Sequence, residues 1–116
     1  VDGRRCPIGE SRITPAGRLK SKFVIHTVGP KYRNESNPEE VLKSAYTSAC
    51  KLAIENGCKS IAFPAISCGV YGYPHQEAAG IALSACRHVS FENLEVTFYI
   101  RQRALFEIFC ELSKNR

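Results

Sequence analysis

The chain has 116 residues, which is enough for one small domain, and its hydrophobic fraction of 44% is typical of a packed core and excludes a disordered tail. No apolar run approaches the roughly 20 residues of a membrane span, and no leader typical of a secretion signal precedes the domain. The sequence therefore predicts a soluble, cytoplasmic protein with no membrane partner.

The formal net charge of +5 is unevenly distributed. Residues 1–33 carry eight Lys or Arg against two acids, which gives +6, and residues 34–116 carry eight against nine, which gives −1. We interpret the basic segment as a solvated face. The alternative is a surface for a phosphate-rich partner such as a nucleotide or nucleic acid, although no aromatic residues are interleaved for base stacking.

The six cysteines favour buried free thiols over disulfides or zinc. Most of them lie in or beside apolar periodic segments, no pair has the C-x-x-C spacing, and the three histidines are scattered. We therefore predict no metal site and no cofactor. The cysteines are Cys6, Cys50, Cys58, Cys68, Cys86 and Cys110.

In the first half of the chain, the patterns predict two strands and a helix. A short edge strand is expected over residues 10–14, ended by Pro15. The β-branched run over residues 23–28 is typical of a strand covered on both faces, closed by Gly29-Pro30. Asn37 followed by Pro38 predicts the start of an amphipathic helix, which Gly57 ends.

The second half repeats the alternation with a strand over residues 60–66, a helical stripe from Pro74 to Val89, a strand over 94–100 and a helix over about 103–113. In that last helix Phe106, Phe109 and Cys110 are expected in the core. The alternation predicts an α/β fold in which helices cover a mainly parallel sheet. Ligands of such sheets bind beyond the carboxyl ends of the strands.

The stretch from Ser60 to Pro74 is the most informative part of the sequence. An apolar strand runs into a loop of small residues and then into Pro74 at the expected start of a helix. Free backbone N–H groups at such a place suit a diphosphate, and Gly69 and Gly72 allow the main chain to come close to it. An ordinary strand–turn–helix joint is the equally plausible alternative from the residues alone.

Four segments resemble successive motifs of the macrodomain family. They are residues 6–10 (CPIGE), 13–15 (ITP), 24–30 (VIHTVGP) and 62–74 (AFPAISCGVYGYP), and the likeness continues into the following helix. The resemblance implies a three-layer α/β/α domain that binds ADP-ribose. It also implies that the protein hydrolyses O-acetyl-ADP-ribose or removes ADP-ribose from proteins, as many members do.

The resemblance assigns the diphosphate to one backbone loop, with Tyr71 beside the distal ribose. The binding residues that it implies are Ser67, Cys68, Gly69, Val70, Tyr71 and Gly72. A non-catalytic ADP-ribose reader and a basic phosphate- or nucleic-acid-binding domain are the alternative functions. ADP-ribosylated proteins are further expected partners.

The first strands of the family, its N-A-A-N segment and its G-G-G-V-D-G loop have no convincing counterpart here. We therefore expect one partial domain over residues 1–116, truncated at its N-terminus, with catalytic residues unknown. Val1-Asp2-Gly3 matches the end of the glycine loop, but its short spacing to Cys6 favours a linker over a catalytic Asp2. A sheet without its first strands should expose an edge or an apolar face, which invites a homodimer.

His26 and Cys68 are two further side chains with acid–base or nucleophilic chemistry. His26 lies within the pattern of a buried strand, so we predict a hydrogen-bonded histidine in the core or at the strand end. Cys68 lies near a helix N-terminus, a place that can lower a thiol pKa. The family commonly has another small residue there, so we do not expect a nucleophile.

Overall fold

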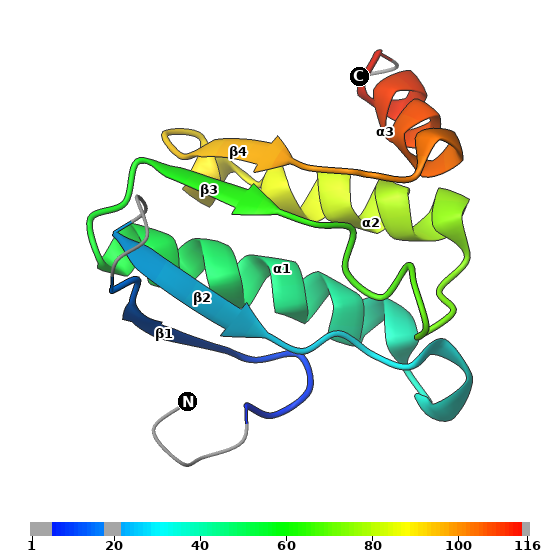
Figure 1. Cartoon of the computed structure of the whole chain (residues 1–116), viewed down its shortest axis with the longest axis horizontal. Coiled ribbons are helices and arrows are strands. Elements are labelled where there is room, and N and C mark those ends of the chain that lie inside the picture. Colours follow the sequence, from blue (N-terminus) through cyan, green and yellow to red (C-terminus); the bar gives the residue numbers. More distant parts are fainter. Residues whose placement is uncertain (1–5, 18–21, 115–116) are drawn as a thin grey trace.

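The computed structural model describes residues 6–17 and 22–114 and shows strands packed on helices (Figure 1). In chain order the elements are β1 (Ser11–Pro15), β2 (Phe23–Thr27), a 3-10 turn (Tyr32–Asn34), α1 (Pro38–Glu55), β3 (Ser60–Phe63), α2 (His75–Cys86), a second 3-10 turn (Val89–Phe91), β4 (Glu95–Phe98) and α3 (Arg103–Lys114). This is the predicted alternation of strands and helices, and the α/β fold class is confirmed.

The strands form two pairs. β1 and β2 are antiparallel, with Ser11 opposite Thr27, and β3 and β4 are parallel, with Ser60 opposite Glu95. β2 and β3 run in the same direction on either side of α1 (Figure 1), but the described strands do not join them by a ladder of hydrogen bonds. The expected mixed sheet is therefore present as two pairs, separated between β2 and β3.

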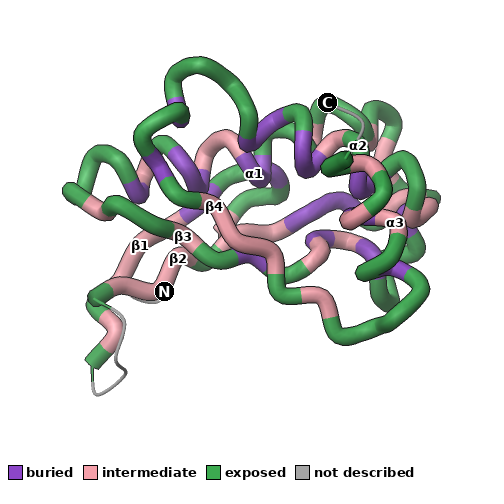
Figure 2. Tube along the Cα trace, turned by 90° about the horizontal axis from the view of Figure 1, so that it is seen from above, coloured by how far each residue is buried: buried purple, intermediate pink, exposed green. Residues whose placement is uncertain are grey.

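The helices bury one face of the strands. α1 packs against β1, β2 and β3, while α2 lies between α1 and α3. Figure 2 shows the buried positions concentrated where these helices meet the strands. The core includes an aromatic chain in which Tyr46 meets Phe63 at 5.0 Å between ring centroids, and Phe98 meets Phe109 at 5.2 Å.

The opposite face of β3 and β4 is open in the described chain. Ser60 and Ala62 of β3, and Tyr99 directly after β4, alternate with core residues, and all three are exposed. The expectation of an uncovered face is confirmed, and the helices described here provide the layer on the other side.

Local chemistry explains most element boundaries. Pro38 occupies the first turn of α1, and Gly57, with a φ of 75°, lies just after its end. β3 ends at Phe63, earlier than predicted, because Pro64 has no N–H for a ladder. The segment expected to be helical up to Val89 ends at Cys86, and Val89 begins the second 3-10 turn.

Phe106 was predicted in the core, but it is exposed, because the buried side of α3 is formed by Leu105 and Phe109. Among the described residues, the helices are too short or too polar to cross a bilayer.

Candidate functional site

The loop from Ser67 to Gly72 connects β3 to α2 and lies at the carboxyl end of β3, as predicted. Its shape depends on two residues with positive φ, Ser67 at 66° and Gly72 at 72°. The N–H of Tyr73 donates to the carbonyl of Ser67 at 2.9 Å, and that of Gly72 donates to Gly69 at 3.0 Å. These bonds close the loop on itself as a compact turn.

Three consecutive main-chain N–H groups at the tip remain available. Within the described part of the chain, Gly69, Val70 and Tyr71 donate these groups to no backbone acceptor. Val70 is fully exposed, and a Cβ built on Gly69 would meet no atom within 4 Å. Successive N–H groups without protein acceptors can bind an anion.

The loop is attached to the segment that follows β2. The hydroxyl of Ser67 donates to the carbonyl of Pro30 at 2.7 Å, and the N–H of Tyr32 donates to the carbonyl of Tyr71 at 3.0 Å. Gly29 allows the close approach, because a Cβ there would lie 2.3 Å from both Ile66 Cγ2 and Ser67 Oγ. Two segments far apart in sequence therefore build one site.

Tyr46 of α1 supports the loop from below. Its buried hydroxyl accepts a hydrogen bond from the N–H of Ile66 at 3.0 Å and lies 3.5 Å from the carbonyl of Pro64. Burial raises the pKa of Tyr46 above the usual tyrosine range, so the phenol stays neutral at physiological pH. A neutral phenol can accept one bond and donate the other.

Tyr71 and Lys31 bring an aromatic ring and a positive charge to the rim. The ammonium of Lys31 lies 5.6 Å from the centroid of the Tyr71 ring, and both side chains are exposed. This is the geometry of a cation–π contact. The ammonium adds positive charge beside the three free N–H groups.

Cys68 is structural. Its side chain is buried, and burial raises the pKa of its thiol, which is the opposite of the lowering that a helix N-terminus can produce. The imidazole Nε2 of His75 lies 3.1 Å from the carbonyl oxygen of Cys68, so His75 holds the loop backbone at the start of α2. We therefore assign neither residue a nucleophilic role.

The other residues singled out from the sequence lie elsewhere. His26 is exposed, hydrogen-bonds Thr14 at 3.2 Å and lies next to the last residue of β2. The expected hydrogen-bonded histidine at a strand end is therefore found, and the alternative of a core histidine is wrong. Asp2 lies outside the described residues. All six cysteines are free, as predicted, although Cys6, Cys58 and Cys110 are only half-buried.

Sequence reasoning found the loop and missed the residues that fix it. The sequence predicts Gly29 only as the end of a strand, and no pattern in it singles out Lys31, Tyr32 or Tyr46. The Gly29-Pro30 pair was the available signal, because a glycine at the end of a strand often marks a close backbone approach. The described residues contain no cluster of three or more potential metal ligands.

Comparison with known proteins agrees with this geometry. The family described as "Macro domain" matches residues 2–82. The chain is 49% identical over 109 residues to the Macro domain-containing protein VPA0103 of Vibrio parahaemolyticus, covering 94% of this chain and 64% of that protein. It is 56% identical over 80 residues to an O-acetyl-ADP-ribose deacetylase of Citrobacter rodentium, covering 68% of this chain and 45% of that protein.

Solved structures agree as well. A macrodomain of Oceanobacillus iheyensis solved with ADP superposes with a TM-score of 0.89 at 38% identity, covering 98% of this chain and 62% of that one. A variant of the same protein was solved with ADPR, with the same TM-score and identity. The present chain thus spans about half to two thirds of the length of these relatives.

Proposed function

Because the chain belongs to the Macro domain family, we propose that its loop Ser67–Gly72 binds the diphosphate of ADP-ribose. The observation that carries the proposal is the run of three free N–H groups at Gly69, Val70 and Tyr71, beyond the carboxyl end of β3. Phosphate oxygens accept strong, charge-assisted hydrogen bonds from such groups. ADP and ADPR, which the Oceanobacillus relative was solved with, both contain this diphosphate.

Two side chains complement the backbone in this proposal. Lys31 supplies a positive charge at the rim, and the ring of Tyr71 provides a flat surface for the distal ribose. The side chains of Cys68 and Ser67 make no ligand contact in this proposal, because the thiol is buried and the Ser67 hydroxyl donates to the carbonyl of Pro30.

Hydrolysis is the second candidate function. It is supported by 56% identity to a relative named O-acetyl-ADP-ribose deacetylase. Hydrolysis of O-acetyl-ADP-ribose, or of ADP-ribose linked to a protein, would use the same diphosphate loop. The described loop offers backbone donors and no side chain placed as a general acid or base, so the loop by itself supports binding without turnover.

Titration calorimetry tests the proposed ligand. ADP-ribose and ADP should both release heat, whereas AMP, which lacks the diphosphate, should bind much more weakly. Equal affinity for AMP would contradict the assignment of the loop. Absence of ADP-ribose binding, with RNA binding that falls steeply with salt, would favour the nucleic-acid alternative.

Turnover and assembly are measured separately. Incubation with O-acetyl-ADP-ribose followed by measurement of released acetate distinguishes hydrolase from reader, and activity that survives Asp2→Ala would exclude Asp2. Light scattering tests the proposed homodimer, for which a clean monomer is the contradicting result.

A further inference from the structure

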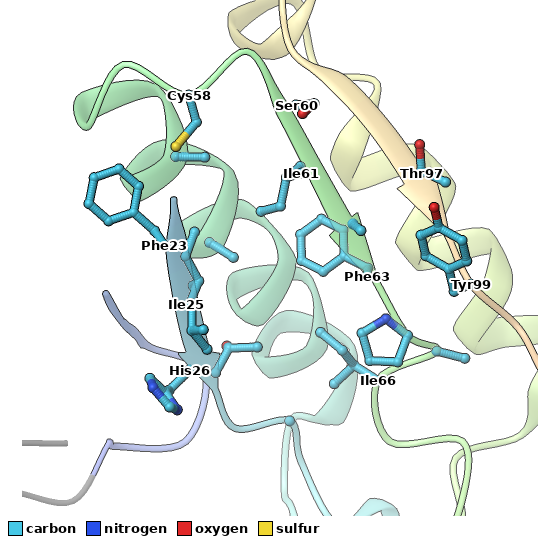
Figure 3. A pocket seen from close by; sticks show the side chains of 18 of the residues that line it. Phe23, Ile25, His26, Cys58, Ser60, Ile61, Phe63, Ile66, Thr97 and Tyr99 are labelled. Carbon is cyan, nitrogen blue, oxygen red and sulfur yellow. The ribbon is translucent and has the colours of Figure 1, made fainter. Parts of the chain in front are cut away.

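The peptide group between Cys68 and Gly69 has a different partner at each end. It follows Ile66, which Figure 3 shows at one end of the cavity that β2 and β3 line. Its N–H, that of Gly69, is the first of the three free donors at the tip of the loop. Its carbonyl, that of Cys68, lies 3.1 Å from Nε2 of His75, the first residue of α2. One end is thus free to bind a ligand, and the other contacts a side chain.

Two turns hold the neighbouring peptide groups and leave this one out. The N–H of Cys68 donates to the carbonyl of Ala65 at 3.4 Å, and the N–H of Gly72 donates to the carbonyl of Gly69 at 3.0 Å. Both bonds involve the peptide groups on either side. Among the described residues, the contact with His75 is the only hydrogen bond that the group between Cys68 and Gly69 makes.

The glycine at position 69 allows this peptide group to turn over. Turning it over changes ψ of the residue before it and φ of the residue after it, as between turns of types I and II, and brings the second φ to a positive value. Glycine adopts positive and negative φ about equally readily. The φ of Gly69 is not in the positive region here, and a Cβ there would meet no atom within 4 Å. Packing therefore does not choose between the two orientations.

The orientation decides what the loop presents to an anion. The described peptide bonds are all trans, and in a trans peptide the C=O and the N–H point to opposite sides. Because the carbonyl of Cys68 points to His75, the N–H of Gly69 points away from that ring. In the reversed orientation the loop would present the carbonyl oxygen, with its partial negative charge, and would repel a phosphate at this place.

The imidazole of His75 is the donor in this contact. A carbonyl oxygen can only accept, so Nε2 carries the proton. The neutral ring with its proton on Nε2 and the doubly protonated ring both donate from this atom, so the bond holds in either state. The side chain of Cys68 is buried, which fixes that residue and leaves rotation of the following peptide group as the remaining freedom.

We propose that His75 is a positioning residue of the diphosphate loop. By donating from Nε2 to the carbonyl of Cys68, it holds the N–H of Gly69 in the orientation that donates to a phosphate oxygen. His75 acts through the peptide group and does not touch the ligand. The identity of the ligand rests on the proposed function, whereas the orientation of the peptide group is a property of the unliganded protein.

Three variants separate the hydrogen bond from the bulk of the side chain. His75→Leu removes the donor and keeps a large side chain that suits a helix, while His75→Gln keeps an N–H donor on a side chain of comparable reach. Gln76→Leu is the matched control, because it removes an exposed polar side chain from the next position of α2. If His75→Leu does not fold, His75→Ala gives the same comparison.

The first measurement is made by NMR without ligand. Turning the peptide group over alters ψ of Cys68 by about 150°, and with it the distance between the Cys68 Hα and the Gly69 amide proton. The nuclear Overhauser effect between these protons should change by about twofold or more in His75→Leu. It should keep the wild-type intensity in His75→Gln and Gln76→Leu. An unchanged effect in His75→Leu would overturn the positioning role, whatever the protein binds.

The second measurement is titration calorimetry with ADP-ribose. His75→Leu should raise the Kd by about tenfold or more, because a hydrogen bond to a charged phosphate is lost. His75→Gln should restore the affinity to near that of the wild type, and Gln76→Leu should leave it unchanged. Equal losses in the Leu and Gln variants, or no loss in His75→Leu, would overturn the proposal.

The two measurements also distinguish this proposal from the proposed function. A wild-type protein that binds no ADP-ribose would refute the proposed function, while the nuclear Overhauser effect would still decide whether His75 orients the peptide group. A changed effect in His75→Leu with wild-type affinity for ADP-ribose would show that the N–H of Gly69 is not a donor to the ligand. That result would overturn the role of His75 in binding.

Discussion

Replacing Gly29 with alanine tests whether the close approach of two segments builds the site. The new Cβ would lie 2.3 Å from Ile66 Cγ2 and from Ser67 Oγ, whereas comfortable carbon contacts are about 3.5–4.0 Å. Ile66 is buried, and the Ser67 hydroxyl is bound to Pro30, so neither atom can move freely. The loop must therefore shift by about 1 Å or more.

The expected loss of stability in Gly29→Ala has two contributions. Overpacking costs about 1–3 kcal/mol, and loss of the Ser67–Pro30 hydrogen bond costs about 1 kcal/mol. The sum of about 2–4 kcal/mol corresponds to a fall in Tm of roughly 8–16 °C for a domain of this size. The affinity for ADP-ribose should fall together with the Tm, because the loop is displaced.

Thermal unfolding followed by circular dichroism measures the effect. Gly69→Ala is the matched control, because a Cβ there meets no atom within 4 Å and the φ of Gly69 is not in the left-handed region. Its Tm should stay close to that of the wild type. A Gly29→Ala protein that unfolds within a degree or two of the wild type would refute the reasoning.

The remaining predictions concern support of the loop, helix propensity and pH. Tyr46→Phe should lower the free energy of unfolding by about 1–3 kcal/mol, because the N–H of Ile66 loses its buried acceptor. Tyr99→Phe on the exposed face is the control and should leave the free energy of unfolding unchanged. Equal denaturation midpoints for the two variants would contradict the role of Tyr46. Gly80→Ala in α2 should stabilise by about 0.5–1 kcal/mol, because a Cβ there meets open space, and a lower Tm would argue against the packing around α2. Burial raises the pKa of Cys68, Tyr46 and Tyr73, and nearby Glu39 and Glu77 add to the effect at Tyr73. The folded state then holds these protons more tightly, so their stabilisation is complete below the ordinary thiol pKa of about 8.5 and is lost as pH rises above it. Tm should therefore fall between pH 8 and pH 10.5, and a Tm that rises over this range would contradict the assigned direction.

The sequence predicted what depends on local pattern. Pro38 and Gly57 fixed the limits of α1, and the apolar run before Pro64 located β3 and the loop beyond it. What depends on distant contacts was not predictable. The attachment of Ser67 to Pro30, and of Tyr71 to Tyr32, joins residues more than 35 positions apart.

The arrangement of the sheet likewise depends on distant contacts and was not predictable from the sequence. The run around His26 reads as a buried strand, yet its outward face is exposed, because burial depends on a covering layer that the strand itself does not encode. The separation of β2 from β3 was likewise invisible in the sequence, since both strands have the composition of interior strands. The hydrogen-bond register of the two strand pairs shows which edge of each strand has no partner strand among the described residues.

The affinity of Gly69→Leu for ADP-ribose tests the central claim most directly. A side chain at Gly69 projects into the open space beside the free N–H groups, so the variant should keep the wild-type Tm. If the loop binds the diphosphate, its heat of ADP-ribose binding should be abolished or its Kd raised by at least about 100-fold, the cost of losing about 3 kcal/mol of contacts. Wild-type affinity in a folded Gly69→Leu protein would show that the diphosphate does not bind at this loop.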